Sequence, residues 1–253
     1  MISLKNSRPY ILGLAGLVAF LGLWELAPRL GLVNPMLLPA PSAIPAALRG
    51  EIASGMWQDA MASSIGHYLM GLAIGSACGV ALGVATGMFR VAEESVAWVV
   101  RLLRPIPGLA WVPFAIIWFG VNAPAAIFII AMGVFWIVYF ATFGAVRSVD
   151  RDLLEVADAF GFRSAWSRLV KIILPAAIPG IFVGLRTALG QAWMAVVAAE
   201  IFGVFGLGQR MMQASSLLAT DIVVVYMLTM AVLYGLIDTG FMRLQNWLLR
   251  WKP

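Results

Sequence analysis

The sequence is poor in the side chains that most often catalyse reactions or bind metals. It contains one cysteine, Cys78, and one histidine, His67, among 253 residues. A single cysteine can form neither an intrachain disulfide nor a cysteine-based metal cluster. A lone histidine lacks the further ligands that a zinc site needs. We therefore predict no metal site and interpret His67 as an interfacial polar residue.

Motifs for nucleotide binding and for hydrolysis are also missing. The sequence has no G-x-x-x-x-G-K-[ST] phosphate loop and no glycine-rich substitute for one. We therefore expect ATP to bind to a separate polypeptide. No two acidic residues share one apolar segment, as the acid pair of a membrane-embedded enzyme would require. We predict no catalytic residue and no cofactor bound by this chain.

Charged residues are scarce. They make up 11% of the sequence, against 62% hydrophobic residues, which is too little polar surface to cover a water-soluble globule of this size. The basic residues outnumber the acidic ones by 17 to 12, but they lie in short clusters between apolar segments. Such clusters indicate membrane topology and not nucleic-acid binding.

Apolar segments long enough to cross a bilayer fill most of the chain. A span needs about 20 such residues, and we predict six helices, the first of them an uncleaved helix: Tyr10 to Leu26, Ile65 to Phe89, Trp98 to Phe119, Ala123 to Val146, Ala176 to Phe202 and Ile222 to Leu244. With a cytoplasmic N-terminus, the outer segments hold only the basic residues Arg29, Arg49 and Arg210. This bias predicts that both termini are cytoplasmic. The fold class is an all-α integral membrane protein, with one transmembrane domain over residues 1–253.

Two connections are long. Residues 28–60 are expected on the extracytoplasmic surface, where Pro35, Pro39, Pro41 and Pro45 should break any helix. Residues 147–175 form a cytoplasmic connection with the pattern of helix, turn and helix.

The second predicted helix carries a glycine at every fourth position. These residues form one ridge on which another helix can approach closely, and they are Gly71, Gly75, Gly79, Gly83 and Gly87. The ridge predicts either static helix packing or a surface that slides during a transport cycle.

The pattern of the cytoplasmic connection predicts a short charged helix with small side chains on its surface. Ala157 and Ala159 lie beside the acidic Glu155 and Asp158, and Gly161 is placed to end the helix in the left-handed conformation. Such a helix suits docking into a cleft on a partner.

This stretch resembles the EAA loop of ABC importer permeases, in which glutamate, two alanines and a glycine precede a Leu-Pro step. Here the step is Leu174 and Pro175, Val156 replaces the first alanine, and the gap from Gly161 to Pro175 is one residue longer than in the family. The resemblance implies a coupling helix that sits in a groove of a cytoplasmic ATPase. It also implies a homodimer, two ATPase subunits that bind ATP and magnesium, an extracytoplasmic substrate-binding protein, and a place in a bacterial inner membrane.

Three further stretches are similar to permeases of the nitrate, sulfonate, taurine and bicarbonate group, which have the type I, MetI-like architecture. They are LLPAPSAI from Leu37, RPIPGLAWVPFAIIWFG from Arg104 and GLRTALGQAWMAVVAAE from Gly184. Gly108 departs from the proline that is usual in the group. The resemblance implies import of a small solute such as a sulfonate, nitrate or bicarbonate, but the sequence does not identify the solute.

Polar and aromatic side chains within the spans are candidates for a translocation path. The tentative set is Trp111, Trp136, Arg186, Gln191, Trp193 and Glu200. For each tryptophan the alternatives are interfacial anchoring or helix packing. Arg186 either reaches the interface or lines the path of an anion, and Glu200 is alternatively an interfacial residue or a partner of the adjoining loop. We expect Asp238 to interact locally with Arg243.

An ion-coupled secondary transporter is the main alternative function. It would usually show acidic residues at the midplane on broken helices, together with an internal repeat. Neither feature is evident, and the partner-shaped cytoplasmic connection would remain unexplained.

Overall fold

The chain is helical throughout the part that the structure describes. A computed structural model describes residues 8–162 and 164–250, and these ranges contain helices and no strand. By length and composition, five helices can cross a membrane, or six if one bent pair counts as a span. The prediction of an all-α membrane protein is confirmed.

The long helices lie close to the predicted spans but extend beyond most of them. They are α1 (Arg8–Arg29), α3 (Met56–Met88), α6 (Ala123–Arg147), α9 (Leu174–Ile201) and α11 (Thr220–Leu248). The predicted start of the second span at Ile65 is wrong, because α3 begins at Met56 and its first turns carry polar residues that an apolar criterion leaves out.

The predicted single helix from Trp98 to Phe119 is wrong. The structure has α4 (Arg90–Leu103), a 3-10 turn η3 (Gly108–Trp111) and α5 (Val112–Phe119), and the two arms meet at 87°. Pro105 and Pro107 lie at the break. Because proline has no backbone N–H and its ring clashes with the preceding turn, a straight helix cannot pass through both.

The prolines of the outer segment do not prevent a helix, contrary to our expectation. Residues 41–53 form η2 (Pro41–Ala43) and α2 (Ile44–Ala53). Pro41 and Pro45 occupy the first positions of these elements, where the missing N–H is not needed for an intrahelical bond.

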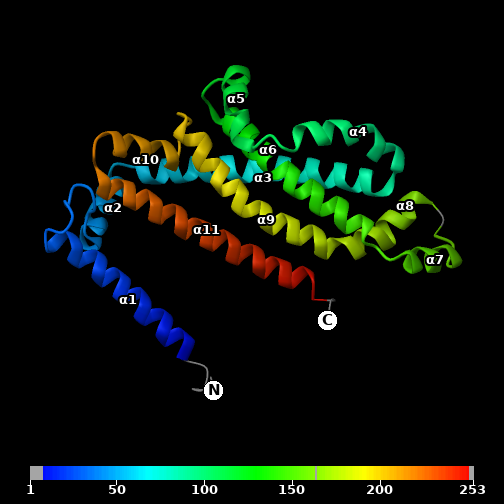
Figure 1. Cartoon of the computed structure of the whole chain (residues 1–253), viewed down its shortest axis with the longest axis horizontal. Coiled ribbons are helices and arrows are strands. Elements are labelled where there is room, and N and C mark those ends of the chain that lie inside the picture. The colour runs from blue at the N-terminus through cyan, green and yellow to red at the C-terminus, as the bar shows by residue number, and fades with distance from the viewer. Residues whose placement is uncertain (1–7, 163, 251–253) are drawn as a thin grey trace.

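Three helices, α3, α6 and α9, form the centre of the molecule, with α11 and α10 (Leu207–Ser216) beside them (Figure 1). The glycine ridge of α3 faces α6. A Cβ added at Gly75 would lie 2.6 Å from the carbonyl oxygen of Ala131, and one at Gly79 would lie 2.9 Å from that of Phe135. The ridge therefore lets two backbones approach more closely than any side chain allows.

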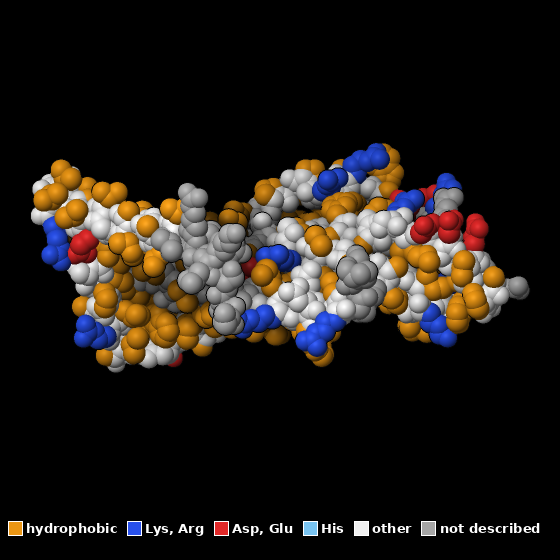
Figure 2. Space-filling view, turned by 90° about the horizontal axis from the view of Figure 1, so that it is seen from below, with side chains coloured by type: hydrophobic (Ala, Val, Ile, Leu, Met, Phe, Trp, Pro, Cys, Tyr) orange, Lys and Arg blue, Asp and Glu red, His pale blue; other side chains and the backbone are white. Residues whose placement is uncertain are grey.

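Figure 1 places α2 and α10 at one end of the molecule, where α1 ends and α11 begins. The opposite end carries α7 (Arg151–Ala159) and α8 (Ala165–Arg168). On the face in Figure 2, hydrophobic side chains cover large areas, and acidic side chains gather at the end that carries α7 and α8.

The first helix joins the others at its C-terminal end. Trp24 donates to the carbonyl oxygen of Pro39 at 3.0 Å, and the hydroxyl of Ser42 donates to Glu25 at 2.8 Å. Only 6% of its apolar window is buried in the chain. The LLPAPSAI stretch thus holds the end of α1.

Candidate functional site

The predicted coupling loop forms the end of the molecule opposite α2. Its first helix, α7, ends at Ala159, and Gly161 follows with a φ of +85°. The backbone N–H of Phe162 donates to the carbonyl oxygen of Ala157 at 2.9 Å, which closes a Schellman turn. The left-handed glycine that the sequence predicted is confirmed.

The side chains of α7 divide into an inner and an outer set. Ala157 is 3% exposed and faces the chain, whereas Glu155, Ala159 and Gly161 are exposed. The side chain of Asp158 lies outside the part that the structure describes. The small residue Ala157 therefore lets α7 lie close against its neighbours.

The second arm of the loop continues directly into α9. Ser164 caps α8 by accepting from the N–H of Ser167 at 3.1 Å, and a π-helical turn η4 (Leu169–Ile173) joins α8 to α9. The helical run extends from Ala165 to Ile201. α9 itself begins at Leu174, two residues before the predicted start of this span at Ala176, and the Leu174 and Pro175 step lies inside the helical run.

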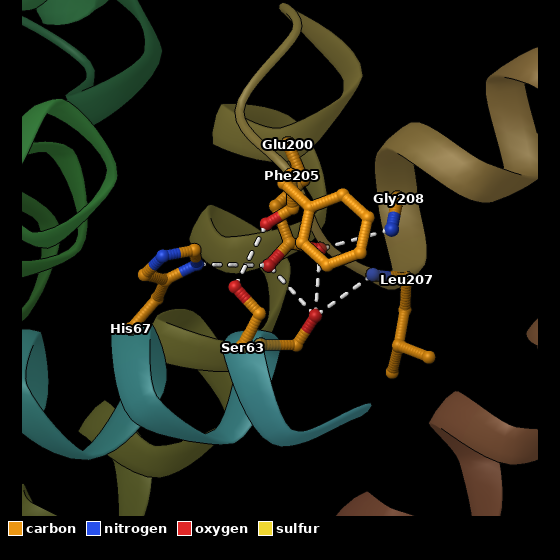
Figure 3. A network of polar contacts seen from close by, with 7 residues as sticks. Ser63, His67, Glu200, Phe205, Leu207 and Gly208 are labelled. Carbon is orange, nitrogen blue, oxygen red and sulfur yellow. Dashed lines mark hydrogen bonds and ion pairs between the residues drawn. The ribbon is translucent and has the colours of Figure 1, made fainter. Parts of the chain in front are cut away.

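Glu200 lies at the C-terminal end of α9 and is fully buried. Its carboxylate accepts from the hydroxyl of Ser64 at 2.7 Å and from the N–H of Gly208 at 2.9 Å, and it lies 3.1 Å from Nδ1 of His67 (Figure 3). Ser64 Oγ also accepts from the N–H of Leu207 at 2.9 Å. Glu200 and Ser64 therefore satisfy the first N–H groups of α10, which would otherwise have no partner.

This network changes two of our interpretations. His67 is 5% exposed and contacts Glu200, so the interfacial position that we assigned to it is wrong. We gave several alternatives for Glu200, and the structure shows one of them: its carboxylate is a hydrogen-bond partner of the segment that follows α9. A Cβ added at Gly206 would lie 2.2 Å from Cδ of Glu200, which accounts for a glycine there.

Arg186 pairs with Asp238 and joins α9 to α11. Its Nε and Nη2 lie 3.2 Å and 3.3 Å from the two carboxylate oxygens. The expected pairing of Asp238 with Arg243 is therefore wrong, because in this structure the carboxylate reaches across to another helix. The ion pair compensates two charges that would be costly within a span.

The remaining candidates for the translocation path have different surroundings in the structure. Trp193 is 8% exposed and packs edge-on against Tyr68, with ring centroids 5.4 Å apart. Gln191 is exposed, and a Cβ added at Gly133 of α6 would lie 3.9 Å from its Cγ. The Nε1 atoms of Trp111 and Trp136 are buried and have no hydrogen-bond partner among the described residues. Their role in a path stays a prediction.

A family model now decides the class of this protein. The family described as "Binding-protein-dependent transport system inner membrane component" matches residues 71–252. The chain belongs to this family. It is the permease subunit of an ABC transporter. This membership rules out the alternative function, an ion-coupled secondary transporter.

Relatives of this permease cover almost its whole length. A protein named for aliphatic sulfonate transport, SsuC of Escherichia coli (strain K12), is 37% identical over 93% of this chain and 90% of its own. The taurine transport system permease protein TauC of the same organism is 31% identical, over 97% and 91%. The bicarbonate transport system permease protein CmpB of Synechococcus elongatus is also 31% identical, over 95% and 90%.

Solved structures of the MetNI methionine ABC transporter share the fold. An inward-facing form aligns with a TM-score of 0.60 and 22% identity, and covers 78% of this chain and 97% of that chain. The MetI-like architecture of the permease is confirmed.

The π-helical turn lies in the segment whose spacing is longer than the resemblance led us to expect. A π turn holds one residue more than an α turn, and the resemblance led us to expect a segment between Gly161 and Pro175 that is one residue shorter. Pro175 cannot donate to Lys171, four residues earlier, so an α turn would lack a hydrogen bond there. We infer that the wider turn takes up the additional residue.

Sequence reasoning missed Ser64 and the α10 N-terminus as partners of Glu200. Ser64 preceded the predicted second helix, and it is 136 positions away from Glu200 in the chain. The one available signal was the glycine pair at Gly206 and Gly208 shortly after a buried acid.

Proposed function

We propose that two copies of this permease form the translocation path of an importer in a bacterial cytoplasmic membrane. Two cytoplasmic ABC ATPase subunits dock at the coupling loops and bind the ATP and magnesium. An extracytoplasmic binding protein delivers the solute at the opposite end, near α2 and α10. Closure of the ATPase pair draws the α7 helices together and moves the permease between inward-open and outward-open states.

The exposed surface of α7 is the observation that carries this proposal. Leu153, Val156 and Phe160 are 49%, 53% and 76% exposed, and their spacing places them on one side of the helix. This surface lies at one end of the long helices and not along their sides (Figure 1). Apolar side chains in that position favour a protein partner over lipid tails.

Charge supports a cytoplasmic location for α7 and for both termini. The helix ends and the π turn at the α7 end hold Arg90, Arg147 and Lys171, whereas the segments at the opposite end hold few basic residues. Clusters of arginine and lysine stay on the cytoplasmic side during insertion. The end of α11 points toward the same side as α7 (Figure 1).

The solute that we propose is a small organic or inorganic oxyanion of the sulfonate or bicarbonate type. The relatives are named for aliphatic sulfonates, taurine and bicarbonate, each of which carries a negatively charged group with oxygen atoms. The binding protein sets the choice among such solutes.

Copurification tests the proposal. The tagged permease, extracted from its native membrane in mild detergent, should recover an ATPase subunit in about equal amount. Glu155→Lys together with Phe160→Ala should remove the ATPase and leave the permease folded. Arg90→Gln is the matched control, because Arg90 is also exposed at the cytoplasmic end but lies on α4. Recovery of a permease that is alone and still transports would overturn the proposal.

A further inference from the structure

A cavity of about 620 Å³ lies between α4 and α6, away from the coupling loop and from Glu200. Its polar lining consists of Arg101, Arg104 and Glu93. Its aromatic wall consists of Tyr139, Phe140 and Phe143 of α6, in which the rings of Tyr139 and Phe143 stack at 26°. The cavity is large enough for a small organic molecule.

Both arginines lie at the end of α4 that is far from its first residue. Arg101 is eleven residues beyond Arg90, the first residue of α4, which amounts to about 16 Å along the axis. α4 runs back along α3 (Figure 1), so this distance leads away from the end of the molecule that carries α7 and α8. Positive-inside placement accounts for a basic residue at that end, such as Arg90, but it does not require two more arginines this far along the helix.

Neither guanidinium has a carboxylate partner among the described side chains. The acidic residue in the cavity, Glu93, is already paired with Arg147 at 2.6 Å. Arg104 instead lies over the ring of Phe140, 4.6 Å from its centroid, and Arg101 lies over Trp98 at 4.9 Å. Ring contacts orient a guanidinium but leave its N–H groups free to donate. The cavity therefore carries two uncompensated positive charges.

We propose that this cavity binds a small oxyanion through Arg101 and Arg104, with the apolar part of the ligand against the aromatic wall. Arginine suits this role because its planar group of donors matches the oxygen atoms of sulfonate, carboxylate or phosphate groups. The two residues are three apart at the end of α4, a spacing that puts them on one side of a helix. The ligand is either the transported solute, which rests on the proposed function, or the headgroup of an anionic lipid.

Binding to the permease alone tests the site. The full chain is placed in phosphatidylcholine nanodiscs and titrated calorimetrically with hexanesulfonate. Replacing both residues, Arg101→Gln with Arg104→Gln, should weaken binding about 10-fold to 100-fold, as expected for lost charge-assisted hydrogen bonds. Arg104→Lys, which keeps the charge, should lose less. Arg90→Gln is the control, since it removes the same charge from the same helix outside the cavity and should bind like the unmodified permease.

A second measurement separates the two sources of the oxyanion. Native mass spectrometry of the same variants counts retained phosphatidylglycerol. Loss of hexanesulfonate binding without loss of lipid assigns the cavity to the solute, and the reverse assigns it to a lipid headgroup. If the double variant matches Arg90→Gln in both measurements, the site does not exist. Because the ATPase takes no part, failure of copurification would overturn the proposed function without affecting this result.

Discussion

The carboxylate of Glu200 lies 3.1 Å from the ring of His67, and the two side chains are 0% and 6% exposed. They join α9 to α3 at the end of the molecule that carries α10, and through Ser64 and Gly208 they also hold α10. A buried carboxylate with this many donors depends on all of them.

Glu200→Gln should therefore destabilise the permease. The amide keeps the shape but has one acceptor oxygen where the carboxylate has two, so the hydrogen bonds of one oxygen are lost or must reverse. The loss of hydrogen bonds in a buried network costs about 1–3 kcal/mol. The thermal unfolding temperature in detergent measures the effect. Glu94→Gln, at a side chain that is 64% exposed, should leave that temperature unchanged. Equal temperatures for both variants would show that the network is not stabilising.

Gly75→Ala should separate α3 from α6. The new Cβ would lie 2.6 Å from a backbone oxygen, which cannot move aside as a flexible side chain can, and we expect a loss of about 1–3 kcal/mol. Gly66→Ala is the matched control on the same helix, because nothing lies within 4 Å of its Cβ. Alanine should be neutral or slightly stabilising there. The unfolding temperature should fall for Gly75→Ala and should not fall for Gly66→Ala.

Gly161→Ala should weaken coupling while the protein stays folded. The position is open, with nothing within 4 Å of an added Cβ, but its φ of +85° disfavours every residue with a side chain. Gly161→Asn should retain more ATPase, since asparagine tolerates this conformation better than alanine. ATPase recovered per permease is the measurement. Equal recovery for both variants would argue against a requirement for the left-handed turn.

Deletion of Val170 should be tolerated. It removes one residue from the π turn Leu169–Ile173 and allows a regular α turn. Deletion of Val183, in the regular part of α9, should instead rotate the helix by about 100° and separate Arg186 from Asp238. Expression level and ATPase recovery should survive the first deletion and not the second. Loss of both in the first variant would contradict our account of the spacing.

The Arg186 and Asp238 pair predicts a non-additive result. Either single change, Arg186→Gln or Asp238→Asn, leaves one charge without its partner within a span. The double variant leaves none, and it should unfold at a higher temperature than at least one of the singles. Strictly additive shifts would mean that the pair contributes nothing to stability.

The sequence predicted the packing surface of α3 correctly, because a single periodic pattern of glycines determines it. The glycines of α3 recur at a helical spacing, so their common face was evident before their partner was known. It failed between Trp98 and Phe119, because hydropathy counts apolar residues and does not register that Pro105 and Pro107 remove hydrogen bonds.

The partners of Glu200 and Asp238 were beyond such reasoning for another reason. His67 and Glu200 are 133 positions apart, and Arg186 and Asp238 are 52 apart. A single sequence states which residues are polar, but the choice of partner depends on how the helices pack. The cavity around Arg104 depends in the same way on the bend after α4, which we did not predict.

Because α8, the π turn and α9 are continuous, one helical run connects the coupling loop to Glu200. The run from Ala165 to Ile201 has 37 residues, or about 55 Å at 1.5 Å per residue. Near its middle, Gly180 and Gly184 approach Ala145 and Ala141 of α6 so closely that a Cβ would clash. From this close contact with α6, the helical run extends about 26 Å to the coupling loop and about 27 Å to Glu200. If the run tilts as a rigid body about this contact, a displacement of the coupling loop produces a displacement of similar size, in the opposite direction, at Glu200.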